Sequence, residues 1–178
     1  MTPTEGAPRQ ALSSYWALAV LFLTNVLNQG DRMLFGVVAE PIRTDLRLSD
    51  TQLALASGLF FVLFSLLGGV FIARHVDRGN RVRILAAGIA LWSLATAWTG
   101  LAHSYLSLSL ARILVGIGEA TAFPVAMSMI PDLFRTETRG RAVSIYQSSN
   151  FVGIVGGTIL AGVLAALMGW RSMFIVCG

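Results

Sequence analysis

Charged residues, cysteine and lysine are all scarce in this sequence. Charged residues make up 12% of the 178 residues, which is about half their share in an ordinary soluble domain. Cys177 is the single cysteine, so the chain can form neither an internal disulfide nor a cysteine-based zinc site. All 13 basic residues are arginines, and they stand in short groups between apolar runs. This distribution argues against nucleic acid as a partner.

Hydrophobic residues, by contrast, make up 55% of the chain and gather in long runs. A helix that crosses a bilayer needs about 20 mainly apolar residues, and several runs reach that length. The sequence therefore predicts an all-α, multi-pass membrane protein. The expected spans lie at about residues 15–39, 50–73, 84–102, 105–130 and 142–168, and a sixth begins at 172.

Capping and breaking residues mark several span ends. Ser49 and Gln52 have the spacing of a capping box, in which each side chain satisfies an unpaired amide at a helix start. Pro124 is expected to bend the fourth span and Pro131 to end it, because proline has no backbone N–H to donate. The fifth span is expected to end at Gly169.

Arginine counts in the connecting segments predict an orientation. Segments 74–83 and 132–141 contain four and three arginines, whereas 42–50 contains two beside two acidic residues and 103–105 contains none. Arginine-rich loops stay on the cytoplasmic side, so residues 1–14 are expected to form a cytoplasmic tail. The expected location is the inner membrane of a bacterium, with the N-terminus in the cytoplasm.

Two charges lie inside the fourth span. Arg112 and Glu119 are seven residues apart, so they share nearly one helix face about 10 Å apart along the axis. A charge at bilayer depth costs at least about 2.5 to 3.5 kcal/mol, and such residues normally face protein or a water-filled cavity. This face of the fourth span is therefore a candidate site.

The first span carries a polar stripe of its own. Asn25, Asn28 and Arg32 recur at helical spacing, and Asp31 lies beside them. In the predicted orientation Asp31 lies about 12 Å and Arg112 about 10 Å below the outer face. Asp31 and Arg112 are therefore expected to pair.

The charges of Asp31, Arg32, Arg112 and Glu119 sum to zero, the balance that buried charges require. Glu119 is expected to lie deeper, as a lone carboxylate. A carboxylate that gains and loses an arginine contact changes its proton affinity, so Asp31 and Glu119 are candidates for proton coupling. Three plainer explanations stay open: a fixed ion pair that orients helices, snorkelling of Asp31 and Arg32 to the outer interface, and a topology anchor at 74–83.

Several motifs resemble the major facilitator superfamily. Residues 77–83 are similar to its signature loop between helices 2 and 3, with Ala73 and Asn80 where that signature has glycine. Residues 112–120 resemble the helix 4 motif of proton-coupled members. Residues 153–162 resemble the glycine-rich fifth helix, without the proline typical of antiporters.

Within the superfamily, residues 20–178 resemble the Spinster-like group. The matching segments are 28–32, 48–52, 77–81, 92–101, 115–120, 131–134 and 169–171. This resemblance implies the N-terminal six-helix bundle of a 12-helix carrier that works by alternating access. The chain itself is expected to be truncated after five full spans.

The resemblance also assigns roles to single residues. Asp77, Arg78 and Arg81 would belong to a cytoplasmic gate. Proton coupling and substrate binding would fall to the charged and polar residues Asp31, Arg32, Arg112 and Glu119, with Asn25 and Asn28 beside them. Independently of the resemblance, Gly153 and Gly157 have the spacing of a helix-packing motif.

Together these features predict a secondary active transporter without cofactor or metal, which moves an amphiphilic or anionic small molecule with protons. The resemblance to the Spinster-like group implies lysophospholipid or sphingoid-type amphiphiles, which eukaryotic members often move, whereas the substrates of bacterial members are ill-defined. An Asp-Arg pair in the first helix equally suits a carrier of small organic anions or sugar acids, and a membrane scaffold is a further alternative. An intramembrane enzyme is disfavoured, because the sequence lacks a nucleophile and base at workable spacing, a metal-ligand set and a phosphate loop.

Overall fold

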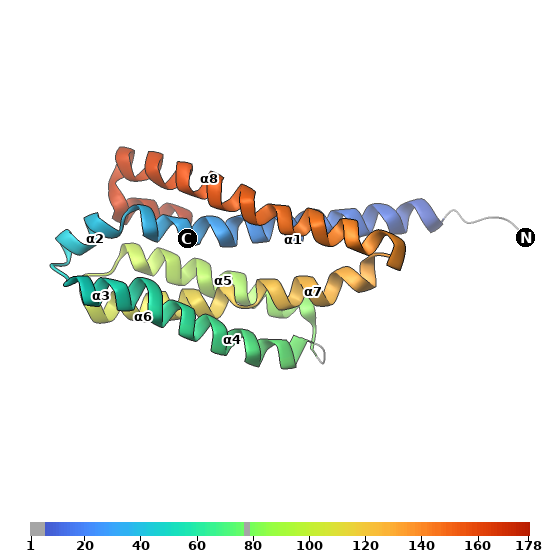
Figure 1. Ribbon diagram of the computed structural model, residues 1–178, viewed down its shortest axis with the longest axis horizontal. Helices are drawn as coiled ribbons and strands as arrows, with labels where there is room; N and C mark the ends of the chain where they lie inside the picture. Colours follow the sequence, from blue (N-terminus) through green and yellow to red (C-terminus); the bar gives the residue numbers. More distant parts are fainter. Residues whose placement is uncertain (1–5, 77–78) are drawn as a thin grey trace, which may run out of the picture.

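The computed structural model describes residues 6–76 and 79–178, and these residues form helices without any strand. The long helices run side by side along an elongated bundle (Figure 1). In chain order the elements are α1 (Gly6–Val37), α2 (Ala39–Asp45), α3 (Asp50–Ala54), the π-helical turn η1 (Leu55–Leu59), α4 (Phe60–Val76), α5 (Arg81–Gly100), α6 (Tyr105–Glu119), α7 (Ala122–Leu133) and α8 (Thr136–Cys177).

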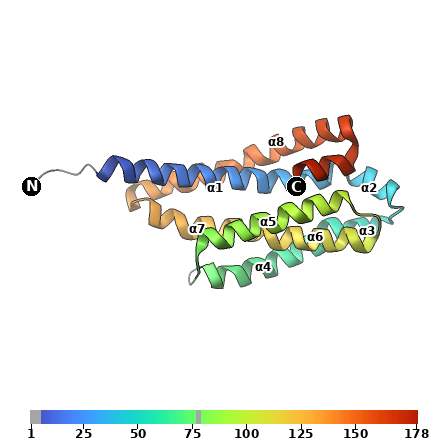
Figure 2. The same ribbon diagram turned by 180° about the vertical axis from the view of Figure 1, so that it is seen from behind.

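The packing of the bundle brings together helices far apart in the chain. α1 packs mainly against α8, α5 packs against α6 and α8, and α4 packs against α6. Figures 1 and 2 show that the start of α1, the α4–α5 connection and the α7–α8 turn lie at one end of the bundle. We call this the α4–α5 end, and the opposite end, with α2, α3 and the α5–α6 turn, the α5–α6 end.

Within the described residues, four helical segments are long and apolar enough to cross a membrane: Asp50–Val76, Arg81–Gly100, Tyr105–Leu133 and Thr136–Cys177. α1, at 32 residues, is also long enough to cross a bilayer, and it carries the polar residues between Thr24 and Arg32. Many large apolar side chains are exposed on the outside of the bundle, among them Leu66 and Phe151. Such a surface suits contact with lipid tails.

The capping box predicted at the start of the second span is confirmed. The Ser49 hydroxyl accepts a hydrogen bond from the Gln52 backbone N–H at 3.2 Å, and the Gln52 side chain accepts one from the Ser49 N–H at 3.0 Å. Asn80 caps α5 in a similar way, because its side chain accepts from the Arg83 N–H at 3.1 Å. These contacts set where the membrane-crossing helices begin.

The fourth span is interrupted where Pro124 was expected to bend it. α6 ends at Glu119 and α7 begins at Ala122, since Pro124 has no N–H to offer the carbonyl one turn earlier. Pro131, however, does not end the helix, and the prediction is wrong by two residues: α7 continues to Leu133. Proline removes the hydrogen bond of its own N–H, and the residues that follow it can still close helical bonds to earlier carbonyls.

The N-terminal limit of the predicted bundle shifts, whereas the fifth span ends at the predicted glycine. α1 begins at Gly6, inside the segment expected to be a polar tail, where alanine, glutamine and leucine favour helix without making it apolar. α8 turns sharply at Gly169, whose φ of 76° and ψ of 163° are non-helical and open mainly to glycine. Residues 170–177 then fold back along the bundle (Figure 1).

Two large apolar cores, one toward each end of the bundle, enclose a layer that holds buried polar groups and a small third apolar cluster of Phe61, Ala95 and Val115. On α1, Leu18 and Leu21 belong to the core cluster near the α4–α5 end, and Leu34 and Phe35 to the cluster near the α5–α6 end. The buried residues between them on this helix are polar: Thr24, Asn25, Asn28 and Asp31. The bundle therefore concentrates its buried polar groups at mid-height.

Candidate functional site

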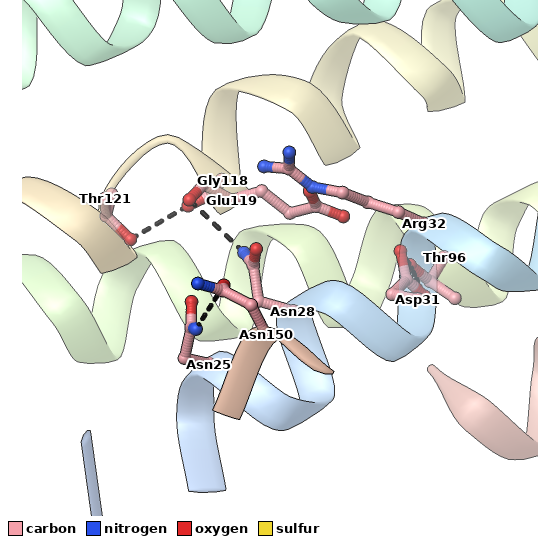
Figure 3. Close-up of polar contacts among 9 residues, drawn as sticks. All are labelled: Asn25, Asn28, Asp31, Arg32, Thr96, Gly118, Glu119, Thr121 and Asn150. Atoms are coloured by element: carbon pink, nitrogen blue, oxygen red, sulfur yellow. Dashed lines mark hydrogen bonds and ion pairs between the residues drawn. The ribbon is translucent and has the colours of Figure 1, made fainter. Parts of the chain in front are cut away.

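The centre of the candidate site is an ion pair between α1 and the end of α6. Arg32 Nε lies 2.7 Å from Glu119 Oε2, and the exposed fractions of the two side chains are 36% and 0%. Figure 3 shows the Arg32 side chain reaching across to Glu119. The expectation that Glu119 is a lone carboxylate is therefore wrong. Its second oxygen, Oε1, is buried without a hydrogen-bond partner in the described structure.

Asn28 holds the backbone of the same glutamate. Its side-chain amide donates to the Glu119 carbonyl oxygen at 3.3 Å (Figure 3). The helix is interrupted before Pro124, so the last carbonyl groups of α6 have no hydrogen-bond donors within the helix. Beside Glu119, Thr121 Oγ1 donates to one of these carbonyls, that of Gly118, at 2.8 Å. Asn28 and Arg32 are one helical turn apart on α1. Asn28 therefore binds the backbone of Glu119 while Arg32 binds its side chain.

Asp31 faces a different helix. Thr96 Oγ1 of α5 lies 3.0 and 3.1 Å from the two Asp31 carboxylate oxygens, and both residues are buried. The expected pairing with Arg112 is present as charge attraction and not as direct contact: no ion pair within 4.0 Å joins the two side chains, although Arg112 is the cation that acts most strongly on Asp31. Matching depth on two helices does not fix the rotation of either helix about its axis, and that rotation turns Asp31 toward α5.

Arg112 is buried, with 2% of its surface exposed. Its Nε and Nη1 have no hydrogen-bond partner among the described residues. Two aromatic rings lie against it instead, with the guanidinium carbon 4.7 Å from the centre of Phe35 and 4.9 Å from the centre of Phe61. Both distances are within the range of cation–π attraction.

Asn25 connects α1 to α8. Its amide donates to Ser149 Oγ at 2.7 Å and to Asn150 Oδ1 at 2.8 Å, and Figure 3 shows the contact with Asn150. Ser149 and Asn150 were not predicted as site residues, although their position inside an otherwise apolar span was a signal. Thr96 gave a weaker signal, since threonine is common in membrane helices.

A cavity of about 790 Å³ opens beside the ion pair. One side is polar and includes Asn25, Asn28, Arg32, Glu119 and Asn150. The other side is apolar and includes Val62, Leu66, Val70 and Phe123. A cavity of this size and mixed lining suits a small polar molecule or the polar end of a larger amphiphile.

A second polar contact lies at the α4–α5 end. Arg81 forms an ion pair with Asp132 of α7 and donates to the Ser128 carbonyl oxygen at 3.2 Å. Of the predicted gate residues, Asp77 and Arg78 lie outside the described residues.

Gly153 and Gly157 lie where α8 meets α1: a Cβ at Gly153 would stand 2.6 Å from the Val26 carbonyl oxygen, and one at Gly157 would clash with the backbone of Gly30.

No group of three or more His, Cys, Asp or Glu side chains in the described parts of the chain could hold a metal ion. The site itself presents carboxyl, guanidinium and amide groups. These groups bind ions and protons through hydrogen bonds and charge.

The sequence model of the Major Facilitator Superfamily matches residues 21–178. The chain belongs to this superfamily. An efflux pump of the superfamily from Mycolicibacterium smegmatis is 33% identical over 98% of this chain and 41% of the relative. A probable L-galactonate transporter of Escherichia coli is 32% identical over 91% of this chain and 36% of the relative. Protein spinster homolog 1 of Xenopus tropicalis is 34% identical over 84% of this chain and 29% of the relative.

A solved structure agrees with these relatives. The crystal structure of a bacterial homologue of the human lysosomal transporter Spinster, in an inward-facing and unoccupied conformation, superposes with a TM-score of 0.88 at 35% identity. The match covers 92% of this chain and 40% of that one. The chain thus has the fold of the N-terminal part of a major facilitator transporter, as the motifs predicted, and is an integral, multi-pass membrane protein. It spans about 40% of the homologues it matches.

Proposed function

We propose that the full-length protein is a secondary active transporter that moves a small organic anion together with protons by alternating access. The observation that carries this proposal is the Arg32–Glu119 pair, 2.7 Å apart on the wall of a mid-bundle cavity. The names of several relatives support the anionic class, among them an L-galactonate and a hexuronate transporter.

The geometry suggests how anion and proton are coupled. Within the described structure Arg32 hydrogen-bonds only through Nε, to Glu119, so its remaining N–H groups are free to bind a carboxylate in the cavity. An anion that binds Arg32 competes with Glu119 for the same positive charge. A buried carboxylate without a counter-ion is costly, and uptake of a proton removes that cost. Anion and proton would therefore bind together, which is the requirement for symport.

The proposed orientation puts the α4–α5 end in the cytoplasm, because that end carries most of the connecting-segment arginines. The N-terminus would then be cytoplasmic, in the inner membrane of a bacterium. Arg81 and its contact with Asp132 would belong to a cytoplasmic gate, together with Asp77 and Arg78.

Transport by the full-length protein in proteoliposomes tests the coupling. With a pH gradient as the only driving force and labelled glucuronate as the probe, we expect uptake by the wild type and none by Glu119→Gln, whose side chain cannot take up a proton. Counterflow exchange of glucuronate, which needs no net proton movement, is expected to persist in the variant. Gradient-driven uptake unchanged in Glu119→Gln would disprove the assigned role.

Glu40→Gln is the matched control for this experiment. Glu40 lies on the exposed helix α2, with its carboxylate 2.6 Å from Arg43 Nη2. That hydrogen bond holds the pKa of the Glu40 carboxyl below its usual value, so this group stays ionised and does not exchange protons near neutral pH. We expect Glu40→Gln to leave gradient-driven uptake unchanged.

The apolar side of the cavity favours a second candidate substrate, an amphiphile. Val62, Leu66 and Val70 form a continuous face of α4 beside the polar groups, and all three are more than half exposed. An acyl chain could lie against this face while its head group reaches Arg32. Lysophosphatidate in place of glucuronate in the same assay distinguishes the two candidates.

A further inference from the structure

Asp31 lies behind the cavity, and the coupling proposed above does not use it. Its neighbour Arg32 lines the cavity, whereas neither Asp31 nor Thr96 is among the described residues of the cavity wall. Asp31 is 7% exposed, and a carboxylate buried to this degree is costly unless hydrogen bonds and opposite charges compensate it. The groups around Asp31 therefore decide how its charge acts on the site.

Thr96 of α5 gives its hydroxyl to Asp31 and not to its own helix. Its Oγ1 lies 3.0 and 3.1 Å from the two carboxylate oxygens, and Figure 3 shows the two side chains together. A buried hydroxyl can instead donate to a carbonyl three or four residues earlier, as those of Thr99, Thr121 and Ser149 do. The nearly equal distances suit an ionised carboxylate, because both of its oxygens are acceptors.

Charged groups from two helices act on the same carboxylate. Arg112 of α6 attracts Asp31 most strongly, and Arg32 of α1 attracts it as well. Glu119 at the end of α6 carries the like charge, and the two carboxylates act on each other. The Cys177 thiol of α8 also senses the charge of Asp31, and α5 contributes the hydroxyl just described. The charge on Asp31 is thus felt at Glu119.

This repulsion connects Thr96 to the proton of Glu119. An ionised Asp31 repels an ionised Glu119, and a proton on Glu119 removes that repulsion. A hydroxyl that donates to Asp31 favours its ionised form, because a hydrogen bond to a charged oxygen is about twice as strong as one to a neutral oxygen. Thr96 therefore acts on Glu119 through Asp31, without touching the cavity.

We propose that Thr96 is a positioning residue for proton coupling: its hydroxyl holds Asp31 as an anion on the α5 side of α1, and this negative charge favours the proton on Glu119. The inference rests on the proposed function, in which Glu119 takes up a proton when an anion binds Arg32. It gives a role to α5, which contributes none of the described residues of the cavity wall.

The pH dependence of glucuronate counterflow by the full-length protein tests this role. In the wild type, exchange is expected to fall as the pH rises, because Glu119 loses the proton that accompanies the anion. Asp31→Asn removes the repelling charge, so exchange is expected to fall at a lower pH. Thr96→Val keeps the shape of the side chain and removes its hydroxyl. We expect it to move the midpoint in the same direction, by about half a pH unit or more.

Thr99→Val is the matched control. Thr99 lies one helical turn further along α5, is similarly buried, and donates its hydroxyl to the Ala95 carbonyl at 3.0 Å. Its counterflow profile is expected to match that of the wild type. Thr96→Ser restores a hydroxyl at the same position and is expected to return the midpoint to the wild-type value. A Thr96→Val profile that coincides with the Thr99→Val profile, or that moves to higher pH, overturns the proposal.

Thermal unfolding of the purified full-length protein tests the contact itself, without any substrate. Thr96→Val is expected to lower the unfolding midpoint more in the wild-type background than in the Asp31→Asn background, because the hydrogen bond to a charged oxygen is lost only in the former. Equal losses in the two backgrounds would sink the proposal. Absence of glucuronate exchange by the wild type would instead be a failure of the proposed function, so the two failures are distinguishable.

Discussion

Single residues of α1 divide their contacts among three other helices. Asn25 bonds to Ser149 in α8, Asp31 accepts from Thr96 in α5, and Arg32 pairs with Glu119 at the end of α6. Each contact joins residues at least 65 positions apart. A change at one polar residue of α1 therefore acts on a specific partner helix.

The Arg32–Glu119 pair is open to a double-mutant cycle with Arg32→Gln and Glu119→Gln in the full-length protein. Residues in one ion-pair network interact by about 0.5–3 kcal/mol, and we expect a value in this range from thermal unfolding. Glu119 is wholly buried, which strengthens the interaction, while the 36% exposure of the Arg32 side chain limits it.

The exposed pair Glu40–Arg43 serves as the comparison for this cycle. Water and salt screen an exposed pair within one helix, so the corresponding cycle with Glu40→Gln and Arg43→Gln is expected to give a smaller coupling. Strict additivity in the Arg32–Glu119 cycle would show that the two side chains do not depend on each other.

Among the elements, α1 and α8 share the most extensive contact, and glycine lets their backbones approach. Gly153 and Gly157 meet Val26 and Gly30 backbone to backbone, with no room for a methyl group. Close backbone approach of this kind is typical of membrane helices, which gain no hydrophobic driving force from association in lipid. The Asn25 contacts to Ser149 and Asn150 lie on the same pair of helices.

Gly157→Ala is expected to destabilise the protein by about 1–3 kcal/mol, because the added methyl group would force α1 and α8 apart. Thermal unfolding of the purified full-length protein measures this loss. Gly156→Ala is the matched control one position away: a Cβ there meets nothing within 4 Å, and alanine favours helix over glycine by about 1 kcal/mol. A midpoint for Gly157→Ala as high as that of Gly156→Ala would contradict the packing role.

At the scale of the whole molecule, two apolar cores enclose one polar layer, and the cavity opens from that layer. The α4–α5 end carries the Arg81–Asp132 contact, and the opposite end is joined by a further ion pair, Arg171 with Asp45 at 2.9 Å. Ion pairs thus join helices of this bundle on both sides of the cavity.

The proposed orientation is tested by single cysteines introduced into the full-length protein after its native cysteines, Cys177 included, have been replaced by serine. His103 and Thr136 are exposed at opposite ends of the bundle. We expect a membrane-impermeant thiol reagent to label His103→Cys in intact cells and Thr136→Cys only after permeabilisation. The reverse pattern would place the N-terminus outside.

The sequence by itself determined the class of the protein and which charged residues of α1 and α6 lie within apolar runs. These features depend on length, hydropathy and spacing along one chain, which are local properties. Three local features could be predicted for the same reason, because each depends on a few adjacent residues: the capping box at Ser49, the interruption near Pro124 and the turn at Gly169.

Only the tertiary structure decided which polar groups meet. Spacing along α1 and α6 predicted depth in the membrane, and depth alone suggested Asp31 as the partner of Arg112. The actual partner pairs depend on how each helix is rotated about its axis, and this rotation is set by close packing such as that at Gly157 and Gly116. For the same physical reason Arg32 meets Glu119, 87 positions away, and Phe61 comes to lie against Arg112.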